Sequence, residues 1–148
     1  FIVAMLIGTQ LLNFEFQYFI KSPLVFEDNW QFGVKETLQE TAKSESTAQK
    51  IIISESIRQA YVYLLFYSQK DPIWLMGQSN LSRRAFVGYN RIGKYEFRAV
   101  DWKKDLREKN MLIVVPVSEV SDKISIPTTQ KKIIYSPTGR ELYYILKT

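Results

Sequence analysis

Met111 to Val115 (MLIVV) is the stretch that decides the fold class of this chain. Its consecutive apolar residues, closed by Pro116, predict a central strand of a sheet. Lys50 to Ser54 (KIIIS) is a second short run, rich in β-branched residues, and predicts another buried strand. A sheet is therefore expected, with these two runs inside it.

Helical patterns precede and follow the second of these runs. A first helix is predicted to begin at Asp28 or Asn29, to contain Gly33 and to end in the polar run 41–49. Its apolar residues recur every four positions on one face: Trp30, Val34 and Leu38. Ser56 and Gln59 form a possible capping box for a second helix. That helix carries its apolar face on Ile57, Ala60, Tyr61, Leu64 and Leu65.

Shorter elements complete the expected fold. Asp71-Pro72 is predicted to be the N-cap and first residue of a short helix that ends near Gly77, before a loop over 78–84. Extended segments are expected at 86–89 and 94–100, and Asp101 is expected to cap a charged helix that runs to Lys109. Strands 131–135 and 140–146 flank Ser136 to Gly139, where Pro and Gly suit a turn, and predict a hairpin.

The predicted fold class is α/β, a mixed sheet with helices packed on it and a C-terminal β-hairpin. We expect one core between helices and sheet, formed by Trp30, Val34, Leu38, Ile51, Ile53, Tyr61, Leu64, Leu65, Ile113 and Val115. The length of 148 residues is that of a single domain. Composition agrees, since 46% of the residues are hydrophobic and 24% are charged.

Two absences from the composition narrow the possible chemistry. The chain has no Cys and no His, which excludes thiolate nucleophiles, Cys-based zinc sites and the commonest general base and metal ligand. The net charge of +5 suits an anionic partner, but nucleic acid and anionic lipid would both be attracted by it. Composition alone therefore does not choose the partner.

Residues 1–13 are predicted to be the end of a transmembrane helix, followed by a single extracytoplasmic domain over 14–148. Phe1 to Leu12 (FIVAMLIGTQLL) carries no charge. As a helix it reaches about 18 Å, short of the roughly 30 Å of a bilayer core, which suits the last turns of a span. Aromatic residues follow where the helix would leave the bilayer, at Phe14, Phe16, Tyr18 and Phe19. A buried strand or helix and a signal-peptide remnant are the alternatives.

No residue combination in the sequence predicts a catalytic, cofactor or metal site. The acidic pairs Asp101 with Asp105 and Glu27 with Asp28 look solvated, and Asp105 lies in a run of Lys and Arg that is typical of an exposed helix face. The six glycines are scattered, so no phosphate-binding loop is present. Ser136 to Gly139 is explained as a turn rather than an anion nest. Asn80-Leu81-Ser82 matches a glycosylation sequon, a short pattern that also occurs by chance.

The stretch 83–98 (RRAFVGYNRIGKYEFR) is the strongest competing signal. Five Arg or Lys are interleaved there with aromatic residues, as in proteins that stack on single-stranded bases: Phe86, Tyr89, Tyr95 and Phe97. Ala85 to Tyr89 matches the second half of an RNA-recognition octamer, but Arg83 and Arg84 stand where the first half requires Gly and an aromatic residue. Aromatic residues in alternating strands are more often core, so nucleic-acid binding is the alternative and not the main expectation.

Several segments together resemble a known family. They are Tyr18-Phe19, Trp30 to Glu36 (WQFGVKE), Tyr61 to Tyr67 (YVYLLFY) with Asp71-Pro72, Gly93 to Arg98 (GKYEFR) and Asp101-Trp102, with the Pro137–Gly139 turn closing the match. In these the chain is similar to the C-terminal soluble domain of bacterial dolichyl-phosphate-mannose-protein mannosyltransferase-like enzymes, which are multi-spanning GT-C glycosyltransferases. The resemblance covers about residues 14–146 and includes no active-site motif.

The resemblance implies a parent enzyme that takes a sugar from a polyprenyl-phosphate carrier. The acidic residues that act in such enzymes lie in loops between early membrane helices, so no catalytic residue carries over to this chain. The expected function is a non-catalytic extracytoplasmic domain that shapes acceptor access. Its expected partners are the membrane, the rest of the transferase and a lipid-linked sugar or acceptor. The rival hypotheses are a single-stranded nucleic-acid or ligand-binding module that uses 83–98, and an interaction domain tethered by one membrane helix.

Overall fold

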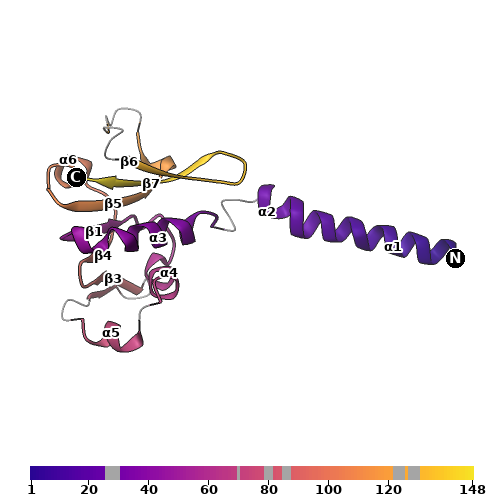
Figure 1. Cartoon of the computed structure of the whole chain (residues 1–148), viewed down its shortest axis with the longest axis horizontal. Coiled ribbons are helices and arrows are strands. Elements are labelled where there is room, and N and C mark those ends of the chain that lie inside the picture. The colour runs from indigo at the N-terminus through magenta and orange to yellow at the C-terminus, as the bar shows by residue number, and fades with distance from the viewer. Residues whose placement is uncertain (26–30, 70, 79–81, 85–87, 122–125, 127–130) are drawn as a thin grey trace.

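A mixed sheet of seven strands, in the order β2-β3-β4-β1-β5-β7-β6, organises the α/β part of the chain (Figure 1). The structure is a computed structural model that describes residues 1–25, 31–69, 71–78, 82–84, 88–121, 126 and 131–148. The strands are β1 (Lys50–Ile53), β2 (Ser82–Arg84), β3 (Gly88–Ile92), β4 (Tyr95–Phe97), β5 (Met111–Pro116), β6 (Lys131–Tyr135) and β7 (Glu141–Lys147).

The centre of the sheet is parallel and its two sides are antiparallel. Strand β1 pairs in parallel with β4 on one side and with β5 on the other, so that Ile51 lies opposite both Tyr95 and Leu112. Strands β3 and β2 extend the sheet beyond β4, and β7 and β6 extend it beyond β5, all antiparallel. The predicted mixed sheet is confirmed, with both predicted buried runs in its parallel centre.

The sheet separates two apolar cores, whereas one core was predicted. The first core contains Val34, Leu38, Ile51, Ile53 and Leu64, with Tyr61 packed against it. Ile113 and Val115 belong to the second core on the opposite face. The prediction was wrong here because β5 is buried along both faces, and successive side chains of a strand point to opposite sides. Leu65 is half-buried, and Trp30 lies outside the described residues.

Helix α3 (Val34–Lys43) begins later than predicted because of Gly33. This residue has a φ of +79° and is the N-cap rather than an interior residue. A Cβ atom on Gly33 would lie 3.1 Å from Leu142 Cδ1 and 3.2 Å from Tyr143 Cδ2. The left-handed backbone favours glycine here, and a larger residue would also push against these two side chains of β7. Gly33 therefore sets where the first helix of the α/β domain meets the hairpin.

Helix α4 (Ala60–Tyr67) packs Ala60 and Leu64 into the first core, as predicted, but its predicted capping box does not form. Ser56 Oγ instead donates to the Glu119 carboxylate, which follows β5. Gln59 occupies the N-cap position with a φ of +52° and no side-chain cap. The Ser56 hydroxyl is thus used to link the segments that follow β1 and β5.

Two short helices begin at the predicted aspartates. In α5 (Pro72–Met76), Asp71 accepts a hydrogen bond from the backbone N–H of Ile73, and Pro72 is the first residue. In α6 (Trp102–Asp105), Asp101 accepts from the N–H groups of Lys103 and Lys104, but the helix ends at Asp105 and not at Lys109. Between these two helices, the predicted loop 78–84 contains a strand, β2. Residues 85–87 lie outside the described part of the chain.

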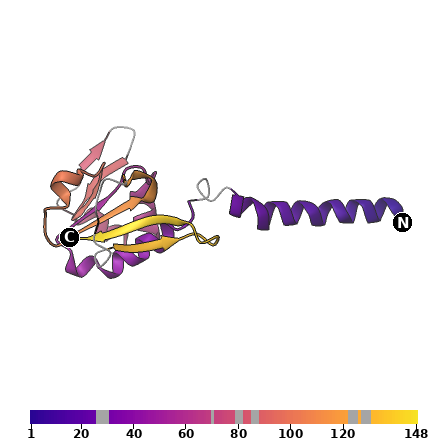
Figure 2. The ribbon, with the colours of Figure 1, turned by 90° about the horizontal axis from the view of Figure 1, so that it is seen from above.

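The C-terminal hairpin is confirmed as β6 and β7. Ser136 Oγ accepts hydrogen bonds from the N–H groups of Thr138 and Arg140, and Gly139 has a φ of +85°. In both views the turn of this hairpin lies at the end of the domain nearest the N-terminal helix, and the C-terminus lies at the other end (Figures 1 and 2).

The N-terminal segment is helical well beyond residue 13. Helix α1 (Ile2–Glu15) continues through a π-helical stretch (Phe16–Lys21) into α2 (Ser22–Val25). The segment projects away from the α/β domain in both views (Figures 1 and 2), and α1 and the π-helical stretch bury no residue. None of the helices in the described ranges is long and apolar enough to cross a membrane.

Candidate functional site

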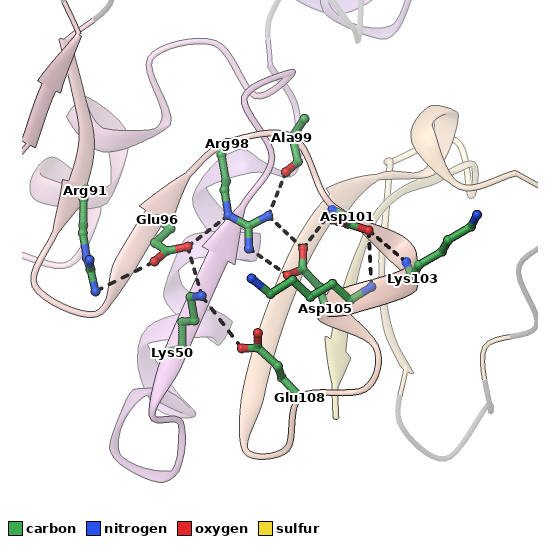
Figure 3. Close-up of polar contacts among 10 residues, drawn as sticks. Lys50, Arg91, Glu96, Arg98, Ala99, Asp101, Lys103, Asp105 and Glu108 are labelled. Carbon is green, nitrogen blue, oxygen red and sulfur yellow. Dashed lines mark hydrogen bonds and ion pairs between the residues drawn. The ribbon is translucent and has the colours of Figure 1, made fainter.

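A network of charged side chains occupies the face of the sheet that carries the second core (Figure 3). Glu96 alternates with Tyr95 and Phe97, which point into the first core, so its carboxylate lies on the opposite face. There Glu96 accepts from Arg98 Nε at 3.0 Å and pairs with Lys50 Nζ at 3.2 Å. Arg91 Nη2 lies 3.9 Å from the same carboxylate. Cations from β1, from β3 and from the residue after β4 therefore surround one acidic group.

Arg98 joins this network to helix α6. Its two terminal nitrogens donate to the two carboxylate oxygens of Asp105, each at 2.8 Å (Figure 3). The Asp105 carboxylate also accepts from the backbone N–H of Asp101 at 2.8 Å. The Asp105 side chain is fully buried, while that of Arg98 is 30% exposed. This two-bond geometry fixes α6 against the end of β4.

The electrostatics of the network suit structure rather than proton transfer. Burial works to raise the pKa of Asp105, but hydrogen bonds from Arg98 and from the backbone of Asp101 outweigh it and hold that pKa below its ordinary value. Burial likewise works to raise the pKa of Glu96, but hydrogen bonds from Arg98 and Lys50 outweigh burial and lower this pKa. Hydrogen bonding to Asp105 raises the pKa of Arg98. Carboxylates with lowered pKa values are weak bases at neutral pH.

The sequence prediction for Asp105 was wrong. It placed this carboxylate on a solvated helix face, whereas the side chain is buried and paired. The spacing of helical ion pairs, three or four residues, does not reveal this partner. Arg98 precedes Asp105 by seven residues, across the turn into α6. Asp101 is exposed and acts as a cap, as predicted. Glu27 and Asp28 lie outside the described residues.

The basic-aromatic stretch 83–98 is divided between core and surface. Tyr95 and Phe97 are buried in the first core, at 0% and 7% exposure, and cannot stack on a base. Tyr89 is half-buried and its ring meets that of Tyr61 edge to face at 5.8 Å. Arg98 is committed to the charged network. Phe86 lies outside the described residues, as do Asn80 and Leu81 of the sequon.

A hollow of ≈ 420 Å³ lies between Phe32, the end of β5 and the C-terminal hairpin. Phe32 lines it on the entry side, Pro116 and Ser118 line it at the end of β5, and Arg140 and Tyr143 line it from the hairpin. Its volume is within the range of small-molecule sites. It combines aromatic walls with charged and hydroxyl groups.

The N-terminal segment presents the largest run of uncovered apolar side chains. Ile7 and Leu12 on α1 are 63% and 67% exposed, and Phe19 in the π-helical stretch is 68% exposed. The aromatic rings that follow α1 gather together: Phe14 and Tyr18 are stacked at 5.7 Å, and Tyr18 meets Phe19 edge to face at 5.0 Å. This segment is the feature of the molecule that most requires a partner.

Within the described residues, no group of three or more acidic, His or Cys side chains is placed to hold a metal ion. No protein family, curated protein or solved structure matches the chain. The function of the chain therefore has to be inferred from the charged network, the hollow, the N-terminal segment and the sequence resemblance.

Proposed function

We propose that this chain is a non-catalytic extracytoplasmic domain of a polyprenyl-phosphate-sugar-dependent membrane glycosyltransferase of the mannosyltransferase type. The observation that carries the proposal is the projecting N-terminal segment, whose exposed residues are mainly apolar and include no charged side chain before Glu15. In water such a surface is costly, whereas in hydrocarbon it is favourable. The proposed role of the segment is the end of a membrane span.

The order of residues along the segment supports this orientation. Uncharged apolar residues come first, the clustered rings of Phe14, Tyr18 and Phe19 follow, and Lys21 comes last. Aromatic rings concentrate where a membrane helix reaches the headgroups. The α/β domain would then lie at the membrane surface, on the extracytoplasmic side that the resemblance implies. Helix α1 has 14 residues and reaches about 21 Å, so the proposal requires further apolar residues before Phe1 in the parent protein.

The state of the acidic residues supports a non-catalytic role. Sugar transfer from a polyprenyl phosphate needs a group that activates the acceptor and charges that stabilise the departing phosphate. Glu96 and Asp105 are engaged in ion pairs that lower their pKa values. The transfer chemistry is assigned to the membrane part of the parent enzyme, and the hollow beside Phe32 and Tyr143 is where this domain would meet an acceptor.

The coding sequence upstream of Phe1 tests the membrane part of the proposal. About a dozen apolar segments, each long enough to span a bilayer, are expected there for a multi-spanning transferase. One such segment alone would favour an interaction domain tethered by a single helix. An upstream sequence without any would contradict the proposal.

A transfer assay tests the division of labour. The full-length parent should glycosylate an acceptor peptide from lipid-linked mannose, and residues 1–148 alone should give no product. Product formed by residues 1–148, and abolished by substitution of one Asp or Glu, would show that the domain itself is the catalyst.

A further inference from the structure

Helices α4 and α5 lie on the part of the domain beside β3 (Figure 1), and their exposed apolar side chains are here called the α4–α5 patch. The patch consists of two residues from each helix, with these exposed fractions: Val62 40%, Phe66 74%, Ile73 73% and Met76 82%. Large apolar side chains with such exposure are ordinary when scattered singly. Here they come from two consecutive helices, two from each, and not from scattered positions.

The composition of α4 indicates that this surface is covered in the working protein. The helix reads AYVYLLFY and has no charged residue. Ala60 and Leu64 pack into the first core, yet the outward residues Val62 and Phe66 are apolar as well. A surface helix normally has a polar outer face, and a helix that is apolar all round is one that is buried on all sides. The outer face of α4 therefore has a partner.

The side chains around the patch indicate what kind of partner it is. The rings of Tyr63 and Tyr67 are stacked at 6.0 Å, Phe66 meets Tyr67 edge to face at 5.2 Å, and Trp74 is half-buried on α5. Tyr and Trp rings, with an apolar body and a polar tip, are typical of surfaces at the boundary between lipid and water.

Charge favours a lipid surface over a second copy of the chain. Residues 56–84 contain four basic residues and one acidic residue: Arg58, Lys70, Arg83 and Arg84 against Asp71. An apolar helical surface with a basic surrounding sequence is attracted to anionic headgroups. Two copies of a chain of net charge +5 would instead bring like-charged segments together.

We propose that α4 and α5 dock on the surface of an anionic lipid bilayer, with Phe66, Ile73 and Met76 inserted among the headgroups. This second membrane contact is independent of the N-terminal helix and of the proposed transferase function. It would hold the domain against the bilayer by its β3 side.

The absence of Cys from the chain allows a direct test with single labels. Phe66→Cys, Met76→Cys and Lys147→Cys variants of the full chain would each carry an environment-sensitive fluorophore. Lys147 is the matched control, because it is exposed on β7, far from α4 and α5 in the sheet order, and lies beside the C-terminus at the end of the domain away from the N-terminal helix (Figure 1). The variants would be bound to phosphatidylglycerol-rich vesicles with or without brominated acyl chains. Unchanged thermal unfolding would show that the labels leave the fold intact.

Brominated lipid should quench the labels at 66 and 76 roughly twofold or more and leave the label at 147 unaffected. Quenching at 66 and 76 should weaken in phosphatidylcholine vesicles and at high salt. Equal quenching at all three positions would overturn the proposal, since the N-terminal helix alone would then explain membrane association. Failure of the full chain to bind vesicles would overturn it as well. A spectral shift at 66 that depends on protein concentration without lipid would assign the patch to a second copy.

Discussion

Single residues explain how such a short helix as α6 is held on the sheet. A helix of one turn has almost no stability of its own, because nucleation costs more than one turn returns. Arg98 and Asp105 supply the missing stability through two parallel hydrogen bonds, and the backbone N–H of Asp101 adds a third bond to the same carboxylate. Removing the Asp105 charge leaves the Arg98 guanidinium with Glu96 as its remaining acidic partner.

The Asp105→Asn substitution should therefore destabilise the domain by about 3 kcal/mol, the lower end of the range for broken buried pairs, because Arg98 remains partly exposed to water. Urea denaturation at pH 7 measures the change. Glu36→Gln, which removes an exposed carboxylate from α3, is the control and should leave the midpoint within about 0.5 kcal/mol of the wild type. Equal midpoints for both variants would show that the Arg98–Asp105 pair adds nothing to the free energy of unfolding.

The Arg98–Asp105 pair should also make the free energy of unfolding depend on pH in the acidic range. Although burial opposes it, the pairing with Arg98 keeps the pKa of Asp105 lowered in the folded state. Its stabilisation is thus complete above the unfolded value of about 4, and is lost as pH falls through the folded pKa. Urea midpoints between about pH 7 and 2 should fall less steeply for Asp105→Asn than for the wild type. Glu96 and Glu40, whose pKa values are also lowered, leave some acid dependence in the variant.

Gly33→Ala should destabilise the domain by about 1–2 kcal/mol from the left-handed backbone alone, and by more if Leu142 and Tyr143 cannot yield to the new methyl group. Gly8→Ala is the matched control, because Gly8 lies inside α1 and a Cβ atom there meets nothing within 4 Å. Denaturant unfolding of the two variants separates them. A Gly33 variant as stable as the wild type would mean that the junction with the hairpin adjusts freely.

At the level of the elements, α4 is fixed by its inward face. Leu64 is fully buried in the first core, whereas Phe66, two residues later, is 74% exposed. Leu64→Ala should cost about 2–5 kcal/mol through lost burial and a cavity, and Phe66→Ala less than about 0.5 kcal/mol. Chemical denaturation of both variants checks the assignment. The reverse order would show that the helix is rotated about its axis.

The elements that the sequence predicted are those specified by local patterns. Ile51 to Ile53 and Met111 to Val115 are continuous apolar runs, and the hairpin turn needs only Ser136 and Gly139 in their places. The start of α3 was missed because it depends on the packing of Gly33 against β7, far away in the chain. The two cores were predicted as one because periodicity does not reveal which face of β5 each partner covers.

The functional features were predictable to an even smaller extent. The apolar N-terminal segment is visible in the sequence because composition alone marks it. The pairing of Arg98 with Asp105 is not, since it depends on how the chain turns after β4. The apolar spacing assigned Tyr61, Leu64 and Leu65 to the core, but it did not predict that Phe66 is exposed.

For the molecule as a whole, the N-terminal segment and the α/β domain should be energetically independent. Helix α1 and the π-helical stretch bury no residue, so deletion of residues 1–21 should leave the free energy of unfolding within about 0.5 kcal/mol. Calorimetry and analytical ultracentrifugation would measure stability and association. The deletion should also reduce self-association in water, because it removes the exposed apolar surface. Unfolding of the shortened chain would show instead that the segment belongs to the core.

The position of β1 in the sheet affects how the domain folds during its synthesis on the ribosome. Both neighbours of this strand, β4 and β5, are made after it. During synthesis Ile51, Ile52 and Ile53 thus remain without one partner until β4 has left the exit tunnel and without the other until β5 has followed. Such distant pairings delay folding. A chain halted before Met111 would therefore expose one apolar edge of the isoleucine strand to chaperones and proteases.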